Sequence, residues 1–284
     1  MGSWTRINGA GMTCPDWPTC HGKLIPSMAD GTIWEWTHRL LVFLIAPLVV
    51  GIAIESWRQR RHSPFIVPTT CAIGALFAVQ VALGAVTVRL SNSPLSVVVH
   101  WGTAMAFVAA LTAMAVFAWS ATDGSRLLPG ARGDGSLLVG VLAGTTAIAF
   151  VTMCVGAYVS SSGAGLACLS LPGCGGRIVV YSPSQYVQML HRFVAAATLL
   201  SAVTAFALAW AWRATRRVRV MSATGLALVL VQIVLGLLNV ALRLPVDLRE
   251  AHAANAALLF LAFVAATTLA ALDEYRLGAT VTPA

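Results

Sequence analysis

Charged residues are scarce in this sequence, because only 10% of its 284 residues are Asp, Glu, Lys or Arg. Soluble domains carry roughly 25% charged residues, so a chain of this composition cannot cover a water-exposed surface in the ordinary way. Apolar residues make up 58% of the chain. The shortage of charge therefore argues against a soluble enzyme and indicates a protein whose solvent is the lipid bilayer.

A nucleic-acid recognition motif is also lacking, although the formal net charge is +8. The basic residues form no stripe along one face. They lie in short loops between apolar runs, as the positive-inside rule describes for cytoplasmic loops. These residues are Arg58, Arg60, Arg61, Arg126, Arg132, Arg213, Arg216, Arg217 and Arg219. We therefore expect no nucleic-acid partner, and we expect the intervening loops, which hold four of the six cysteines, to face outward.

Seven apolar runs have the length of about 20 residues that a helix needs to cross a bilayer. They lie at about 34–56, 66–88, 97–119, 137–159, 187–211, 221–242 and 252–272. The sequence thus predicts an all-α, polytopic membrane protein.

The second part of the chain repeats the first at an offset of 152 to 154 residues. Cys14 and Cys20 recur as Cys168 and Cys174. In the same way, His38 recurs as His191, Gln80 as Gln232, and His100 as His252. An offset that spans four helices gives both halves the same orientation, so we expect two tandem four-helix bundles in a parallel repeat. We place the N-terminal half at 1–122, a cytoplasmic linker at 123–136 and the C-terminal half at 137–284. The counterpart of the run at 137–159 would lie before Met1, so we expect the first half to lack its first helix and the source DNA to encode an apolar segment upstream.

Four histidines each open an apolar run: His38, His100, His191 and His252. Ionisable side chains at membrane depth are costly and often mark function, although a single one can be a hydrogen-bonded packing residue. In each half, two parallel helices can present one imidazole each across a gap, which is the ligand arrangement of a six-coordinate heme. Four arginines could pair with heme propionates or extend to the lipid interface: Arg39, Arg89, Arg192 and Arg243.

Cys14 and Cys20 lie in a loop containing Gly and Pro that we place on the outer side of the membrane, where disulfides can form. Their spacing leaves open whether they form a disulfide or remain two unpaired loop cysteines. His21 follows them directly, but two cysteines and one histidine are too few ligands for a closed zinc site. We therefore expect His21 to be a loop residue.

The two halves differ one helical turn before the first histidine of each. Glu35 stands three residues before His38, whereas Gln188 stands three residues before His191. A pocket that moves protons or stabilises positive charge needs an ionisable group, and a pocket that only holds an electron carrier does not. We therefore expect a reactive heme site in the first half and a structural or electron-transfer site in the second.

Two segments resemble the heme A synthase family, namely residues 9–26 (GAGMTCPDWPTCHGKLIP) and residues 35–40 (EWTHRL). The resemblance covers essentially the whole chain, including the four histidines and the duplicated architecture. It implies an eight-helix enzyme of the bacterial plasma membrane that oxidises the methyl group of heme O to the formyl group of heme A, for cytochrome oxidase assembly. The sequence departs from this pattern in showing three long spans, not four, in its first half.

The resemblance also implies roles and partners. By position, Glu35 resembles the catalytic carboxylate, His38 and His100 the ligands of the substrate heme O, and His191 and His252 the ligands of a heme b cofactor. Cys14 and Cys20 resemble an outer-loop pair tied to activity and redox exchange, and Cys168 and Cys174 the equivalent disulfide. The implied partners are heme O synthase, cytochrome oxidase assembly factors and a membrane electron donor or acceptor, and a homo-oligomer is compatible with the pattern.

Two other classes of protein fit parts of the sequence. A non-enzymatic di-heme electron carrier, similar to a cytochrome b quinol module, would have two equivalent sites and no need for Glu35. A transporter would use the histidines as proton relays and would have broken helices at the midplane, whereas these histidines lie at helix ends. The bound pigment separates the three readings: only heme b indicates the carrier, heme b with heme O or heme A indicates the synthase, and no heme indicates the transporter.

Overall fold

A computed structural model of the chain describes residues 2–29, 31–61, 63–122, 134–170, 172–178 and 180–281. These residues form eight α-helices, one 3-10 helix and no named strand. The helices are α1 (Gly2–Ile7), α2 (Thr32–Arg58), α3 (Ile66–Arg89), α4 (Pro94–Thr122), α5 (Gly135–Ser161), α6 (Pro183–Ala211), α7 (Arg216–Ala241) and α8 (Val246–Val281), with the 3-10 helix η1 at Ala164–Leu166. Most of the linker expected at 123–136, including Arg126 and Arg132, lies outside the described residues.

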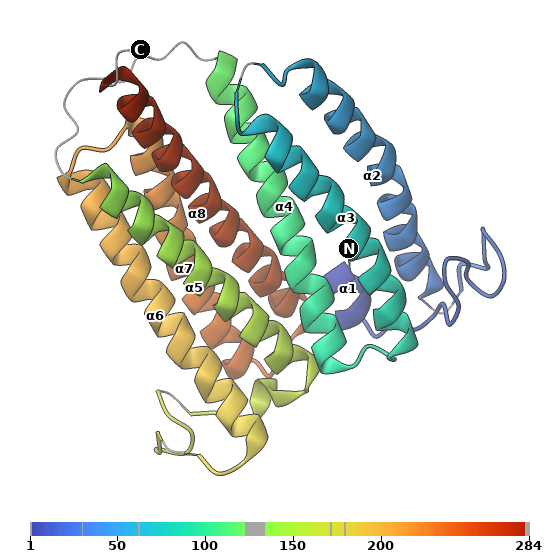
Figure 1. The fold of residues 1–284 in the computed structure, drawn as a ribbon. Coiled ribbons are helices and arrows are strands. Elements are labelled where there is room, and N and C mark those ends of the chain that lie inside the picture. Colours follow the sequence, from blue (N-terminus) through green and yellow to red (C-terminus); the bar gives the residue numbers. More distant parts are fainter. Residues whose placement is uncertain are drawn as a thin grey trace.

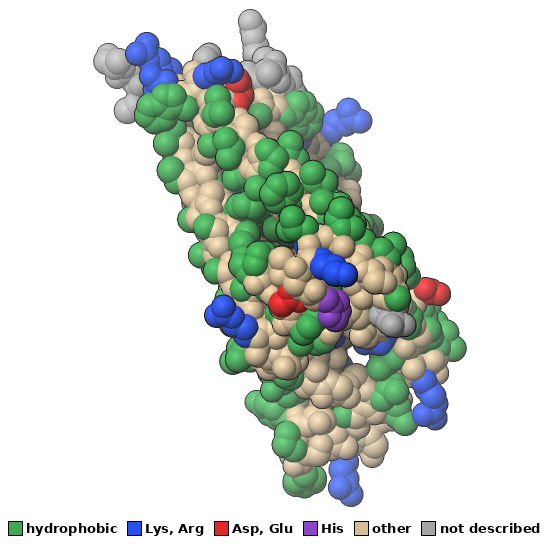
Figure 2. Space-filling model, turned by 90° about the vertical axis from the view of Figure 1, so that its right-hand side faces the viewer, with side chains coloured by type: hydrophobic (Ala, Val, Ile, Leu, Met, Phe, Trp, Pro, Cys, Tyr) green, Lys and Arg blue, Asp and Glu red, His purple; other side chains and the backbone are tan. Residues whose placement is uncertain are grey.

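Seven of the described helices, α2 to α8, are long and apolar enough to cross a membrane. The prediction of an all-α, polytopic membrane protein is therefore confirmed. Most of these helices are longer than the expected apolar runs; α2, for example, covers Thr32–Arg58 where the run covers about 34–56. The reason is that helical hydrogen bonding continues into the polar residues that flank each apolar run. Figure 2 shows one face of the molecule, on which mainly hydrophobic and uncharged atoms lie between the charged side chains at the upper end and those near and below the centre.

The second half forms a closed bundle, in which α5 contacts α6 and α8, and α7 contacts α6 and α8. In the first half, α3 contacts both α2 and α4, and the halves meet where α4 packs on α5 and α8 (Figure 1). The most buried large side chain is Phe263 on α8, which is 0% exposed. A Cβ on Gly225 of α7 would lie 2.7 Å from the Phe263 ring, so only glycine allows the two helices to approach this closely.

The parallel repeat is visible in the contacts as well as in the sequence. Helix α1 has the position of the last turns of α5 at an offset of 154 residues. It packs on α2 and α8, just as α5 packs on α6 and α4. Arg6 and Ser160 are related by the same offset, and the Arg6 Nη2 atom donates a hydrogen bond to Ser160 Oγ at 3.0 Å. Two equivalent residues can touch only near the axis that relates the halves, so this contact is one that the predicted repeat requires.

Helix α2 is the least enclosed of the spans. Only 6% of its most apolar window is buried within the protein, against 61% for α8. Its main contacts are with α1 and α3. Exposed apolar side chains such as Phe43, Leu48 and Trp57 therefore cover its outer surface, as expected where a helix faces lipid.

Candidate functional site

The four histidines occupy equivalent places in four helices that run in the same direction. His38, His100 and His252 are each the seventh residue of their helix, and His191 is the ninth. The first residues of α2, α4, α6 and α8 all lie toward the lower end of the molecule in Figure 1. The structure thus brings all four imidazoles to one end of the bundle, next to the cysteine loops.

In the second half, the rings of His191 and His252 are neighbours in an edge arrangement, with their centres 6.5 Å apart and their planes inclined by 68°. Metal–imidazole bonds are about 2 Å long, so two rings on opposite sides of one metal have their centres roughly 6 Å apart. The Nδ1 atom of His252 is buried and has no hydrogen-bond partner among the described residues. Buried polar atoms usually have a partner, so this pair has both the spacing and the unsatisfied polar capacity that fit a heme.

Each histidine ring lies against a glycine of the preceding helix, where a Cβ would meet the ring. The distance from that Cβ to the nearest ring atom would be 3.1 Å for Gly2 and His38, 3.5 Å for Gly84 and His100, 2.9 Å for Gly156 and His191, and 3.2 Å for Gly236 and His252. These glycines obey the same 152- to 154-residue offset as the histidines. Both halves therefore make room for an imidazole in the same way, which supports a shared ligand-binding design.

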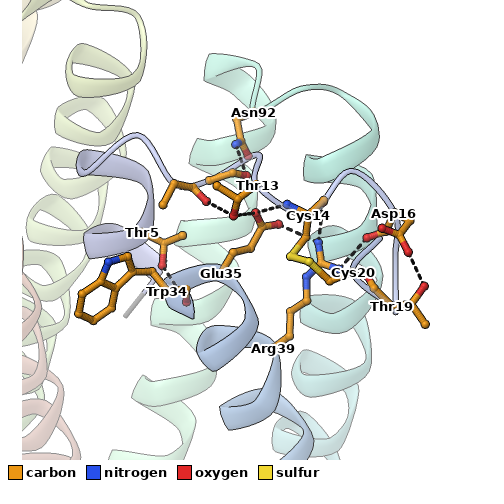
Figure 3. Close-up of polar contacts among 12 residues, drawn as sticks. Thr5, Thr13, Cys14, Asp16, Thr19, Cys20, Trp34, Glu35, Arg39 and Asn92 are labelled. Carbon is orange, nitrogen blue, oxygen red and sulfur yellow. Dashed lines mark hydrogen bonds and ion pairs between the residues drawn. A yellow bond between two sulfur atoms is a disulfide. The ribbon is translucent and has the colours of Figure 1, made fainter. Parts of the chain in front are cut away.

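The carboxylate of Glu35 is buried, with the residue 5% exposed, and it holds the first cysteine loop (Figure 3). Its Oε2 atom accepts hydrogen bonds from the backbone N–H of Cys14 at 2.9 Å and from the Thr13 hydroxyl at 3.0 Å. Its Oε1 atom pairs with Arg39 Nη2 at 2.7 Å. Glu35 therefore connects α2, the cysteine loop and a guanidinium one turn further along the helix.

Gln188 makes the matching contacts in the second half without a charge. Its Oε1 atom accepts from the backbone N–H of Cys168 at 2.5 Å, and its Nε2 atom donates to the carbonyl of Gly165 at 2.8 Å. The residue is 3% exposed. The difference between Glu35 and Gln188 is thus a difference in charge and proton affinity at a nearly constant shape.

Both cysteine pairs form disulfides, Cys14 with Cys20 and Cys168 with Cys174, and each has a Cα–Cα distance of 4.7 Å. This resolves the choice between a disulfide and unpaired cysteines. His21 bonds through its Nε2 atom to the carbonyl of Thr13 at 2.8 Å, so it is a loop residue, as expected. Within the described part of the chain, no group of three or more His, Cys, Asp or Glu residues could hold a metal ion.

Arg39 and Arg192 bind the backbones of the two loops. Arg39 donates from Nη1 to the carbonyls of Asp16, at 2.6 Å, and Thr19, and from Nη2 to the carbonyl of Cys14 at 3.0 Å. Arg192 repeats the pattern on Ser170 at 2.8 Å, Gly173 at 3.0 Å and Cys168 at 2.7 Å. These bonds, with the Glu35 pair, use all four Nη hydrogens of Arg39. Arg89 and Arg243 are exposed, and the propionate role of all four arginines stays a prediction.

Asp16 organises the tip of the first loop. Its carboxylate accepts from the Thr19 hydroxyl, from the backbone N–H of Gly22 at 2.9 Å and from the backbone N–H of His21 at 2.6 Å. These hydrogen bonds, with that from Thr19 the strongest influence, favour the ionised form and lower the pKa of Asp16 to about 2. In the second loop Ser170 takes this place, and its hydroxyl accepts from the N–H of Gly175 at 2.6 Å.

Sequence reasoning missed the loop-holding contacts of Glu35 and Arg39 and the ring-facing role of the glycines. Gly84 and Gly236 recur within the repeated segments, so the offset could have drawn attention to them. The contacts themselves depend on which helix faces which, and the spacing of residues along the chain does not contain that information.

Comparison with known proteins gives consistent matches. The family model COX15-CtaA, described as cytochrome oxidase assembly protein, matches residues 28–264. A heme A synthase of Bacillus pumilus is 30% identical over 206 residues, which are 70% of this chain and 65% of that protein. A heme A synthase of Shouchella clausii is 30% identical over 78% of this chain and 73% of its own length. A heme A synthase of Bacillus licheniformis is 28% identical over 89% of this chain and 84% of its own length. The match to the first of these relatives thus covers somewhat less than two thirds of its length.

Proposed function

The chain belongs to the COX15-CtaA family of cytochrome oxidase assembly proteins, and from this membership we propose that it is a heme A synthase. The reaction is oxidation of the methyl group of heme O to the formyl group of heme A. The observation that carries the proposal is the family match over residues 28–264, because it includes all four histidines and Glu35.

In this proposal the two halves bind different hemes. The N-terminal half, at 1–122, binds the substrate heme O through His38 and His100. The C-terminal half, at 137–284, binds a heme b cofactor through His191 and His252. The 6.5 Å separation of the latter two rings and the glycine facing every histidine support these ligand pairs.

Heme b, when bound, supplies a one-electron redox centre close to the substrate site. The residues of the chain provide binding, orientation and proton transfer. Glu35 lies one turn before His38 on the same face of α2, so its carboxylate stands beside the ring that would hold the substrate. A buried carboxylate in this place can accept a proton or stabilise a developing positive charge. Gln188 has no ionisable group, so it can neither accept a proton nor offer a negative charge. It stands three residues before His191, a proposed ligand of the heme b cofactor.

The loops and their surroundings complete the proposal. We place the histidines and both disulfide loops at the outer face of the bacterial plasma membrane, because the arginine-rich loops are at the opposite helix ends. Cys14 and Cys20 are the candidates for redox exchange at this face, and Cys168 with Cys174 is the structural counterpart. Heme O synthase would deliver the substrate, cytochrome oxidase assembly factors would receive the product, and a membrane electron carrier would exchange electrons.

The test is to purify the full chain from a host that makes heme O and to extract the bound pigments. We expect heme b together with heme O or heme A, and net formation of heme A during turnover. Heme b alone would favour the non-enzymatic di-heme carrier, for which the equivalent histidine pairs are the one supporting observation. A protein that binds no heme would contradict both.

A further inference from the structure

A cluster of three charged side chains lies where the two halves meet: Arg6 on α1, and Arg249 and Glu250 on α8. The Ser3 hydroxyl donates to Glu250 Oε1 at 3.2 Å and so joins α1 to α8, while Arg6 Nη2 donates to Ser160 Oγ on α5 at 3.0 Å. Burial is the largest influence on Arg6 and lowers its pKa; the charge of Arg249 lowers this pKa further, and that of Glu250 raises it. Arg249 and Glu250 are therefore close enough to Arg6 for their charges to act on it.

The cluster lies beside the second heme site, toward the end of the bundle that carries the disulfide loops. Arg249 is three residues before His252 on α8, so the two side chains share a face of the helix. Ser160, the partner of Arg6, is four residues after the glycine of α5 that faces the ring of His191. Arg249 directly, and Arg6 through Ser160, are thus about one helical turn outward from the two imidazoles of this site.

The cluster has no counterpart in the first half. At the offset of 152 residues, Val97 and Val98 stand in the places of Arg249 and Glu250. At the offset of 154 residues, Arg6 itself corresponds to a serine of the second half. The charged group is therefore not part of the repeated design, and it lies next to one heme site only.

The donors of these arginines are less committed than those of the arginines that hold the loops. Arg39 and Arg192 bind the backbones of the two disulfide loops. Arg6 makes one side-chain hydrogen bond, to Ser160. Within the part of the chain that the structure describes, no group accepts a hydrogen bond from the guanidinium of Arg249. Donors therefore remain for a further acceptor.

The chemistry of a heme supplies such an acceptor. Its propionate carboxylates lie on one edge of the ring, and a heme held within a helix bundle points that edge out of the membrane, because a carboxylate is costly to bury in hydrocarbon. Guanidinium groups form short, charge-assisted hydrogen bonds with carboxylates. Arg6 and Arg249 bring two positive charges and Glu250 one negative charge, so one propionate would balance the cluster.

We propose that Arg249 and Arg6 bind a propionate of the heme held by His191 and His252. This inference rests on the proposed function, which assigns heme b to that histidine pair. Because Arg6 belongs to the first half, the cofactor of one half is held partly by a residue of the other. The alternative is an ion pair between Arg6 and Glu250 that only fastens α1 to α8.

The experiment titrates the heme-free, full-length H100A variant, chosen to restrict binding to the second site, with heme b and with heme b dimethyl ester. The ester has the same porphyrin and iron but no propionate charge. Adding Arg249→Met or Arg6→Met should weaken the binding of heme b by about tenfold or more, the usual effect of a hydrogen bond to a charged group. Neither substitution should change the affinity for the ester. The ester therefore reports whether the site is still folded.

Arg243→Met is the matched control, because it removes the same side chain from an exposed position at the same end of the bundle. It should leave both affinities unchanged. Glu250→Gln tests the alternative. If Glu250 competes with the propionate for the two guanidiniums, E250Q should bind heme b more tightly. If the cluster only fastens α1 to α8, E250Q should weaken the binding of heme b as R6M does.

The outcomes distinguish this inference from the function on which it rests. Equal weakening of heme b and of its ester in R249M and R6M would show a structural role, overturn the propionate contact and leave the synthase proposal in place. A selective loss of heme b affinity in R243M, with R249M and R6M unchanged, would also overturn it. A chain that binds no heme in either half would overturn both proposals.

Discussion

At the scale of single residues, the most informative comparison is between Glu35 and Gln188. Both side chains are buried, both bind the first cysteine of a disulfide loop through its N–H, and both stand three residues before a histidine. Since Gln188 holds its loop as a neutral amide, the hydrogen bonds to the loop do not require the charge of Glu35. What the charge adds is the ion pair with Arg39 at 2.7 Å and a group beside His38 that can exchange a proton.

Replacing Glu35 with Gln should therefore separate structure from catalysis. We expect the variant to keep its heme content, because Gln188 shows the contacts that an amide can make in this place. Heme A formation should fall by about 10² to 10⁴-fold, the usual contribution of a general acid or base. The measurement is pigment analysis by chromatography, with accumulation of heme O or an alcohol intermediate. Glu55→Gln, on an exposed part of the same helix, is the control. A normal yield of heme A from E35Q would remove Glu35 from the mechanism.

At the scale of elements, the helices approach each other where glycine faces histidine. A Cβ on Gly156 would lie 2.9 Å from the Cε1 atom of His191, closer than real Cβ contacts allow. Helix α5 contains three other glycines, and around one of them, Gly144, a Cβ would meet nothing within 4 Å. The two positions differ in surroundings and belong to one helix, so they form a natural pair for comparison.

Gly156→Ala should displace the His191 ring and lower the heme content of the second half. The overpacking should cost about 1–3 kcal/mol. Gly144→Ala should bind heme normally and be slightly more stable, because alanine is favoured over glycine within a helix by roughly 0.5–1 kcal/mol. Heme content per protein and the thermal midpoint of each variant check this expectation. Equal heme content in G156A and G144A would show that the glycine does not shape the ligand site.

The two disulfide loops offer a comparison at the same scale. The first loop has the ionisable Asp16 at the position where the second loop has Ser170, which does not titrate. The folded pKa of Asp16, about 2, lies below its ordinary value of 3.8. The contribution of ionised Asp16 to the stability of the first loop is thus fully present above pH 3.8 and is lost as the pH falls through about 2.

Hydrogen exchange of the loop amides tests this dependence. After correction for intrinsic rates, protection of the Gly22 and His21 amides should decrease as the pH falls from about 4 to 2. Protection of the Gly175 amide, which is bonded to Ser170, should not follow this titration. Asp16→Asn should remove the pH dependence from the first loop. A parallel loss of protection at Gly22 and Gly175 would indicate general acid unfolding.

At the scale of the whole molecule, the two halves share their paired histidines, the glycines that face them and their disulfides, while most other positions differ. The apolar runs were sufficient to predict seven spans, because the thickness of the bilayer sets the length of each run. The 152- to 154-residue offset was sufficient to predict a parallel repeat, because recurring residues can be read directly from the sequence. Contacts between distant residues were not predictable in the same way. The pairing of Gln80 with His100, and of Asn255 with Gln232, depends on the rotation of each helix about its axis, which near-uniformly apolar spans do not reveal.

The central claim is that each half holds one heme between its two histidines. The most direct measurement is the heme-to-protein ratio and optical spectrum of the purified chain and of four single variants, H38A, H100A, H191A and H252A. We predict two hemes in the loaded protein, loss of the same heme from H191A and H252A, and loss of the other from H38A and H100A. Retention of the full heme content and an unchanged spectrum in H191A and H252A would contradict the account.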